Sequence, residues 1–140
     1  MKGKWASVAV LMAAAIALLS QPSCAHNQHL VAITVSPQGE TITLSELGQD
    51  VTTQFTATGI YIHPPENRDL TKTAIWATDS PSIITLDPNT PGLVHTTGEG
   101  CGTNLGVTAT VYTDNGNPSG NVVVGSSTMN VSFVTTNLCP

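Results

Sequence analysis

The sequence has 140 residues, of which 40% are hydrophobic and only 9% are charged, and its formal net charge at pH 7 is −5. Beyond the N-terminal segment, nine acidic residues are accompanied by only two basic ones, Arg68 and Lys72. Proteins that bind nucleic acid or anionic lipid head groups carry clusters of lysine and arginine, so this composition argues against both kinds of partner.

The N-terminus has the pattern of a secretory signal peptide. Basic residues precede an unbroken apolar run from Val8 to Leu19, which is too short to span a bilayer. Cleavage before Cys24 would leave an N-terminal cysteine for acylation, with residues 1–23 as the signal and 24–29 as a tether. Cleavage before His26 is the alternative, and it would remove that cysteine. We therefore expect an exported protein, lipid-anchored in the bacterial cell envelope (outer membrane or periplasm) or otherwise secreted.

Short alternating stretches of apolar and polar residues follow the signal, and Gly, Pro, Asn and Asp separate them. This pattern is typical of antiparallel strands with one wet face, and no stretch has a sustained helical period. In chain order, the predicted strands cover residues 30–35, 41–47, 51–59, 70–78, 83–86, 93–95, 105–111 and 122–133.

The period-two pattern also predicts which side chains face the core. Val31 should point inward with Ile33 in the first strand, and Phe55 should do so in the third. Trp76 is expected between the two sheets, as the central aromatic residue of the core. Gly125 interrupts the last strand and predicts a β-bulge there.

About seven to nine short strands in roughly 100 residues predict an all-β fold, an immunoglobulin-like two-sheet Greek-key β-sandwich over residues 30–133. An up-and-down barrel is the alternative. If Cys24 is acylated or removed, Cys101 and Cys139 form the remaining cysteine pair of an exported chain. We expect a disulfide between them that ties the C-terminal tail, residues 134–140, to the sandwich.

Four parts of the chain share the pattern of one known kind of domain: Val31–Pro37, Gln54–Tyr61, Asp69–Thr71 leading to Ile75–Asp79, and Gly92–Val94. Together they resemble the group 2 bacterial immunoglobulin-like domain, a module of intimin- and invasin-like surface proteins. The resemblance spans about Leu30 to Phe133 and implies a sandwich used for adhesion, spacing, or binding of proteins and glycans, without catalysis. It implies no fixed site, because such domains share a core rather than a binding surface.

The chain departs from that family in having a single copy of the domain, two added cysteines and the segment His63 to Arg68 in place of a short polar turn. Pro64 and Pro65 cannot donate to a strand ladder, so this segment is predicted to be an exposed loop. Tyr61, His63 and Arg68 make it the candidate binding loop, for an unknown protein or glycan. The alternative is a rigid surface turn without a partner.

The sequence contains no recognisable catalytic or cofactor motif. No Gly-x-Ser-x-Gly elbow occurs, and no histidine follows Cys101, which excludes a blue-copper ligand set. His26 and His29 are expected to be solvated in the tether, while His63 and His95 are single and separated. A calcium site is conceivable from aspartates beside turns, although they form no spaced ligand loop: Asp50, Asp79, Asp87 and Asp114.

We therefore expect a non-catalytic module without a metal or cofactor, and a small secreted hydrolase or metal-binding protein is the alternative from another class. An accessory subunit of an envelope complex is a further alternative, with the run Val122 to Val124 as a strand edge for pairing. Beyond these classes, the sequence indicates neither an oligomeric state nor a particular partner.

Overall fold

The structure is a computed structural model that describes residues 28–113, 121–135 and 139. Within these residues all regular structure is β, and no helix is long and apolar enough to cross a membrane. The strands are β1 (His29–Ser36), β2 (Glu40–Leu44), β3 (Thr52–Gln54), β4 (Thr56–Ile62), β5 (Glu66–Asp69), β6 (Ile75–Thr78), β7 (Ile84–Leu86), β8 (Leu93–Thr96), β9 (Gly102–Tyr112) and β10 (Val122–Phe133).

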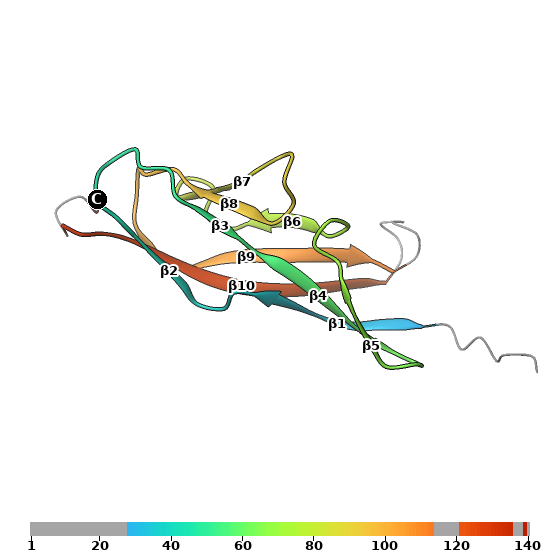
Figure 1. The fold of residues 1–140 in the computed structure, drawn as a ribbon. Helices are drawn as coiled ribbons and strands as arrows, with labels where there is room; N and C mark the ends of the chain where they lie inside the picture. The colour runs from blue at the N-terminus through green and yellow to red at the C-terminus, as the bar shows by residue number, and fades with distance from the viewer. Residues whose placement is uncertain (1–27, 114–120, 136–138, 140) are drawn as a thin grey trace, which may run out of the picture.

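The strands form a β-sandwich, in which β9 and β10 lie side by side as the longest pair (Figure 1). One layer is a four-stranded sheet in the order β2-β10-β9-β6. The other layer contains two three-stranded sheets, β1-β4-β5 and β3-β8-β7, which are continuous through the chain because only Phe55 separates β3 from β4. The β2–β10 pair is parallel and the other strand pairs are antiparallel. The predicted all-β sandwich is confirmed.

The core lies between the two layers and is built from alternate residues of the strands. Met129, Val131 and Phe133 are buried along β10, and Phe55 is fully buried at the junction of β3 and β4. Phe55 is a core residue, as its place in the alternating pattern predicts. The largest fully buried side chains are Phe55, Leu44, Ile84, Met129, Val35, Val94 and Val107.

Trp76 takes a less central place than the sequence suggests. It lies on β6, an edge strand of the four-stranded sheet, and is only partly buried against the core. Its indole Nε1 donates a hydrogen bond to the carbonyl oxygen of Thr71 at 2.9 Å. The strand predicted from Leu70 begins only at Ile75, because residues 70–74 form a turn in which the Ala74 amide donates to the Leu70 carbonyl.

Val31 also differs from the prediction, because β1 contains an irregularity that simple alternation does not anticipate. The register of β1 against β4 shifts between Leu30 and Ala32. This bulge turns Val31 outward, where 48% of the residue is exposed, while Ile33 and Val35 are buried as predicted.

Gly125 is not a bulge. It pairs in register with Ala109, and the register shift of β10 lies further on, between Met129 and Val131. A Cβ atom at Gly125 would lie 2.5 Å from the carbonyl oxygen of Ile33 in β1. Glycine is therefore required here because strands of opposite layers approach closely, and not because the strand is interrupted.

The predicted disulfide between Cys101 and Cys139 is present, with the two Cα atoms 5.4 Å apart. It fastens residue 139 to the segment just before β9, so the C-terminal tail is tied to the sandwich as expected. The proposed signal peptide and Cys24, His26 and the predicted loop at Asp114 to Gly120 lie outside the described residues.

Candidate binding site at the hairpin end

The segment predicted as a binding loop is a β-hairpin. β4 runs to Ile62, a short turn contains both prolines, and pairing resumes at Glu66, so that β5 lies antiparallel to β4. The prediction of a loop from His63 to Arg68 is therefore wrong from Glu66 onward, where the chain forms β5. Pro64 and Pro65 lie in the turn, where no ladder hydrogen bond is needed. They therefore do not prevent β5 from pairing with β4 directly after the turn.

Arg68 is the centre of a polar cluster on this hairpin. Its guanidinium carbon lies 4.9 Å from the centroid of the Tyr61 ring, and its Nη2 is 2.7 Å from Oε2 of Glu66. Arg68 also donates to the side-chain oxygen of Gln28, whose Nε2 in turn donates to Glu66 at 2.9 Å. The cluster therefore links the residue before β1 to both strands of the hairpin.

The hydrogen bond from Arg68, with a second one from Gln28, lowers the pKa of Glu66 to about 2. The same contact with Glu66 raises the pKa of Arg68 above its ordinary value. Both side chains of the pair are nearly half exposed, so the ion pair itself stabilises the fold little. Its main effect is geometric, because it fixes the positions of Gln28 and of the Arg68 guanidinium over Tyr61.

Tyr61 lines a cavity of about 450 Å³ at this end of the sandwich. The apolar part of the lining comes from both layers: Leu30 and Tyr61 belong to one layer, and Val111 and Val123 to the other. Among the described residues, the polar part of the lining is formed by Gln28, His29, Tyr112, Thr113 and Asn121. The cavity therefore lies between the two layers, at the end of the sandwich that carries the hairpin.

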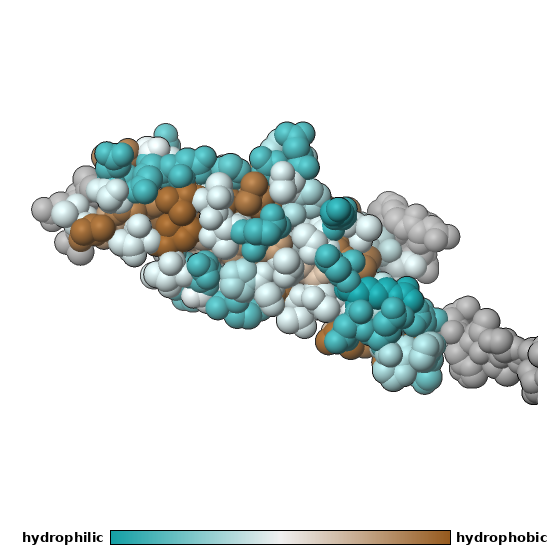
Figure 2. Space-filling model, in the orientation of Figure 1, coloured by the Kyte–Doolittle hydropathy of each residue, from teal (hydrophilic) through white to brown (hydrophobic). Residues whose placement is uncertain are grey.

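The three predicted binding residues have different positions. Tyr61 lines the cavity, and Arg68 holds the Tyr61 ring from the hairpin side without lining the cavity itself. His63 lies in the exposed turn with a φ of 60° and is not among the residues that line the cavity. In Figure 2, the hairpin forms a strongly hydrophilic surface at this end of the molecule.

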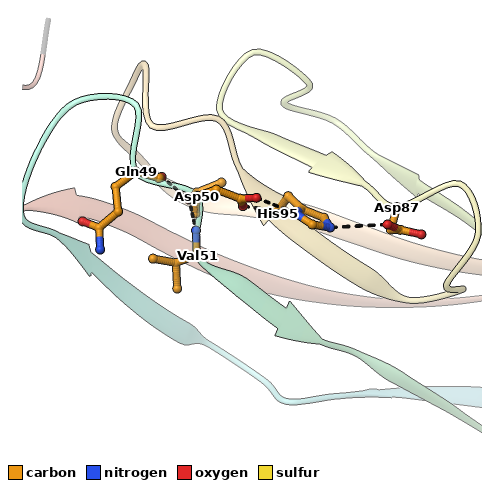
Figure 3. Close-up of polar contacts among 6 residues, drawn as sticks. Gln49, Asp50, Val51, Asp87 and His95 are labelled. Atoms are coloured by element: carbon orange, nitrogen blue, oxygen red, sulfur yellow. Dashed lines mark hydrogen bonds and ion pairs between the residues drawn. The ribbon is translucent and has the colours of Figure 1, made fainter.

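A second polar cluster surrounds His95 on the outer face of the β3-β8-β7 sheet (Figure 3). The ring Nδ1 is 3.0 Å from both carboxylate oxygens of Asp50, and Nε2 is 3.6 Å from Oδ2 of Asp87. The hydrogen bond with Asp50 is the main cause that raises the pKa of His95. Hydrogen bonds from backbone amides, chiefly that of Asn89, lower the pKa of Asp87.

Neighbouring backbone contacts hold Asp50 in place. The buried Thr96 hydroxyl accepts from the amide of Val51 and donates to the carbonyl of Gln49, each at 2.9 Å. Both nitrogens of the His95 ring face carboxylates, which leaves neither in place to activate a hydroxyl nucleophile. The cluster is therefore suited to joining β8 to the chain just before β3 and just after β7, and not to covalent catalysis.

The His95 cluster was missed by sequence reasoning, which treated this histidine as isolated. Of the aspartates considered for calcium, Asp50 and Asp87 meet at His95, whereas Asp79 lies apart and accepts from the amide of Gly106 at 2.8 Å. Among the described residues, no three His, Cys, Asp or Glu side chains are arranged to hold a metal ion. The sequence signal for this cluster is that Asp50 directly precedes the predicted strand 51–59 and Asp87 directly follows the predicted strand 83–86.

The sequence matches none of the protein-family models and none of the curated proteins with which it was compared.

Proposed function

We propose that this chain is a non-catalytic immunoglobulin-like module of the bacterial cell envelope, which binds a protein or glycan at its hairpin end. The observation that carries the proposal is the cluster of Gln28, Glu66 and Arg68 beside Tyr61, next to a cavity between two sheets. Side chains that are already held in place lose little conformational entropy on binding, which favours recognition.

The proposed location rests on the sequence. The basic N-terminus and short apolar run indicate export, and the cysteine at position 24 provides a site for a lipid anchor. The disulfide between Cys101 and Cys139 is consistent with an oxidising compartment outside the cytoplasm. We assign the domain to the group 2 bacterial immunoglobulin-like family on the segments that resemble it, and the sandwich architecture supports that assignment.

A strand edge supports the second candidate function, an accessory subunit that pairs with another envelope protein. β2 pairs with β10 only along Met129 to Phe133. Among the described residues, the first half of β10 pairs with β9 alone. The carbonyl of Ser126 accepts a hydrogen bond from Gln38, so it points to the side of β10 on which β2 lies. Alternate residues of a strand direct their backbone N–H and C=O groups to the same side, so those of Val124 also point away from β9. Only the first half of β10 is thus available as the predicted edge.

Co-sedimentation of the purified, exported chain with isolated bacterial envelopes tests the proposal. We expect saturable binding that Arg68→Ala weakens about tenfold or more, a loss of about 1.4 kcal/mol. Lys72→Ala is the matched control, because it removes an exposed cation that is not part of the cluster. Equal effects of the two substitutions would refute binding at the hairpin end.

Val124→Pro separates the two candidate functions. Proline removes the amide that an added strand would use, and it is tolerated at free strand edges. Hairpin-end binding predicts unchanged envelope affinity for Val124→Pro, whereas pairing through β10 predicts its loss. Thermal unfolding of each variant verifies that it remains folded.

A further inference from the structure

We infer that the cavity between the sheets binds a neutral saccharide. The inference rests on the proposed function, since it names the ligand class of the same hairpin end. The volume of about 450 Å³ lies within the range of about 300–1,000 Å³ typical of small-molecule sites.

The walls of the cavity combine flat aromatic and aliphatic surfaces. Tyr61 and Tyr112 are both partly buried and both line it, with Val111 and Val123 contributed by the layer opposite Tyr61. A pyranose ring has an apolar face of C–H groups, and such a face packs well on a tyrosine ring. The arrangement therefore provides two aromatic surfaces for a sugar within one opening.

The polar groups at the cavity suit hydroxyl groups better than charged ones. Asn121 carries an amide that can both donate and accept. The Thr113 hydroxyl donates to the carbonyl of Asn121 at 3.0 Å, and its oxygen can accept from a ligand. The Gln28 amide is held in place before any ligand arrives, because its nitrogen donates to Glu66 and to the carbonyl of Pro64 and its oxygen accepts from Arg68. Its oxygen keeps a second lone pair that can accept from a ligand hydroxyl. Uncharged groups of this kind match the alternating donors and acceptors of a sugar.

The distribution of charge argues against an anionic ligand. None of the described residues that line the cavity is Asp, Glu, Lys or Arg. The nearby cation, Arg68, is already paired with Glu66 at 2.7 Å and directed over Tyr61. An acidic sugar or a phosphate would have to break this pair, whereas a neutral sugar leaves it intact.

The test is a titration of the ¹⁵N-labelled, exported chain, followed by amide chemical shifts. The neutral probes are maltotriose and triacetylchitotriose, and trigalacturonate is the acidic control. We expect saturable shifts with at least one neutral probe, in Tyr61, Tyr112 and Asn121 and not around His95. Tyr61→Ala should weaken that binding at least tenfold, Tyr61→Phe should retain it, and Thr85→Ala on the distant β7 is the matched control.

Because the shift map uses the unmodified chain, the test does not depend on whether Tyr61→Ala folds. Tighter binding of trigalacturonate than of both neutral probes would overturn the inference, and so would shifts that fail to saturate with either neutral probe. If the chain still binds envelopes in that case, the ligand class is wrong and the proposed function stands. If it binds neither saccharides nor envelopes, the proposed function fails as well.

Discussion

Arg68 lies over the ring of Tyr61, with its guanidinium carbon 4.9 Å from the ring centroid, although the two residues are on different strands of the hairpin. Arg68 is directly opposite Gly59, and Glu66 is directly opposite Tyr61. Directly paired residues point to the same face of a sheet, so the cation and the ring share one face and meet diagonally. The space beside Gly59 itself is filled by Leu70 and Leu30, since a Cβ atom there would clash with Cδ1 of Leu70. Strand register thus positions a residue of the cavity wall.

Removal of Arg68 should release Glu66 from its hydrogen bond. In the intact protein the pKa of Glu66 is about 2, and in Arg68→Ala we expect it to rise toward the ordinary value of about 4.3, because the main cause of the shift is gone. The carboxyl carbon shift of Glu66, followed by NMR against pH, measures this directly. The pKa of Asp79, which lies outside the cluster, should not move, and an unchanged pKa at Glu66 would show that the ion pair does not form in solution.

Gly125→Ala should destabilise the fold by about 1–3 kcal/mol, the usual cost of overpacking. The added methyl group would meet the backbone carbonyl of Ile33, which cannot rotate away as a side chain could. Gly100→Ala is the matched control, because a Cβ there would lie 3.4 Å from the nearest Ile83 atom, at ordinary contact distance. Urea unfolding of both variants measures the difference, and equal stabilities would contradict the close approach of β1 and β10.

Phe55→Ala should destabilise the protein by about 3–5 kcal/mol, because Phe55 is fully buried between the layers. Trp76→Ala should have a smaller effect, about 1–3 kcal/mol, because the larger Trp76 side chain is only partly buried at the edge strand. Chemical unfolding followed by circular dichroism is suitable for both variants. A larger loss of stability in Trp76→Ala than in Phe55→Ala would mean that Trp76, and not Phe55, is the central aromatic residue of the core.

The His95 cluster predicts a pH dependence of stability. The pKa of His95 is raised in the folded protein, so its contribution is complete below about pH 6.5, the unfolded pKa, and is lost as pH rises through the folded pKa. The pKa of Asp87 is lowered, so its contribution is present above about pH 4 and is lost in more acidic solution. Stability from this cluster should therefore be greatest between about pH 4 and 6.5.

His95→Gln provides the control for that prediction, because glutamine keeps a polar side chain but does not titrate. The melting temperature of the unmodified protein should fall between pH 6 and pH 9, which lie about half a unit below and about two and a half units above the ordinary histidine pKa. The fall should be smaller in His95→Gln. Parallel pH profiles of the two proteins would mean that His95 gains no stabilisation from Asp50 and Asp87.

The fold could be predicted from the sequence where strands alternate over a long distance. β10 was predicted from Val122 to Phe133, as observed, because its buried residues recur without interruption. β5 was missed because all its residues are exposed and polar, so it has no apolar pattern, and it is a strand only because β4 lies beside it. Alternation alone also extended the tryptophan strand into a turn that hydrogen bonds of Leu70 define.

The candidate site was less predictable, because it depends on which strands become neighbours. Tyr61 and Arg68 could be singled out by residue type beside a proline-rich turn, but the cavity requires residues from both layers. The His95 cluster joins residues separated by 45 positions, and its signal appears only once β8 is known to lie between β3 and β7. Sequence periodicity indicates the face of a strand and does not identify its neighbours.

The intact mass of the protein recovered from an expressing bacterium, measured with and without reductant, tests most directly whether this sandwich is an envelope module. We predict membrane-bound protein with the mass of residues 24–140 plus acyl groups, which increases on reduction by the hydrogens added to one disulfide. An unacylated chain that begins at His26 would instead be a free secreted domain. A cytoplasmic chain that retains Met1 and has reduced cysteines would contradict the proposed export and location.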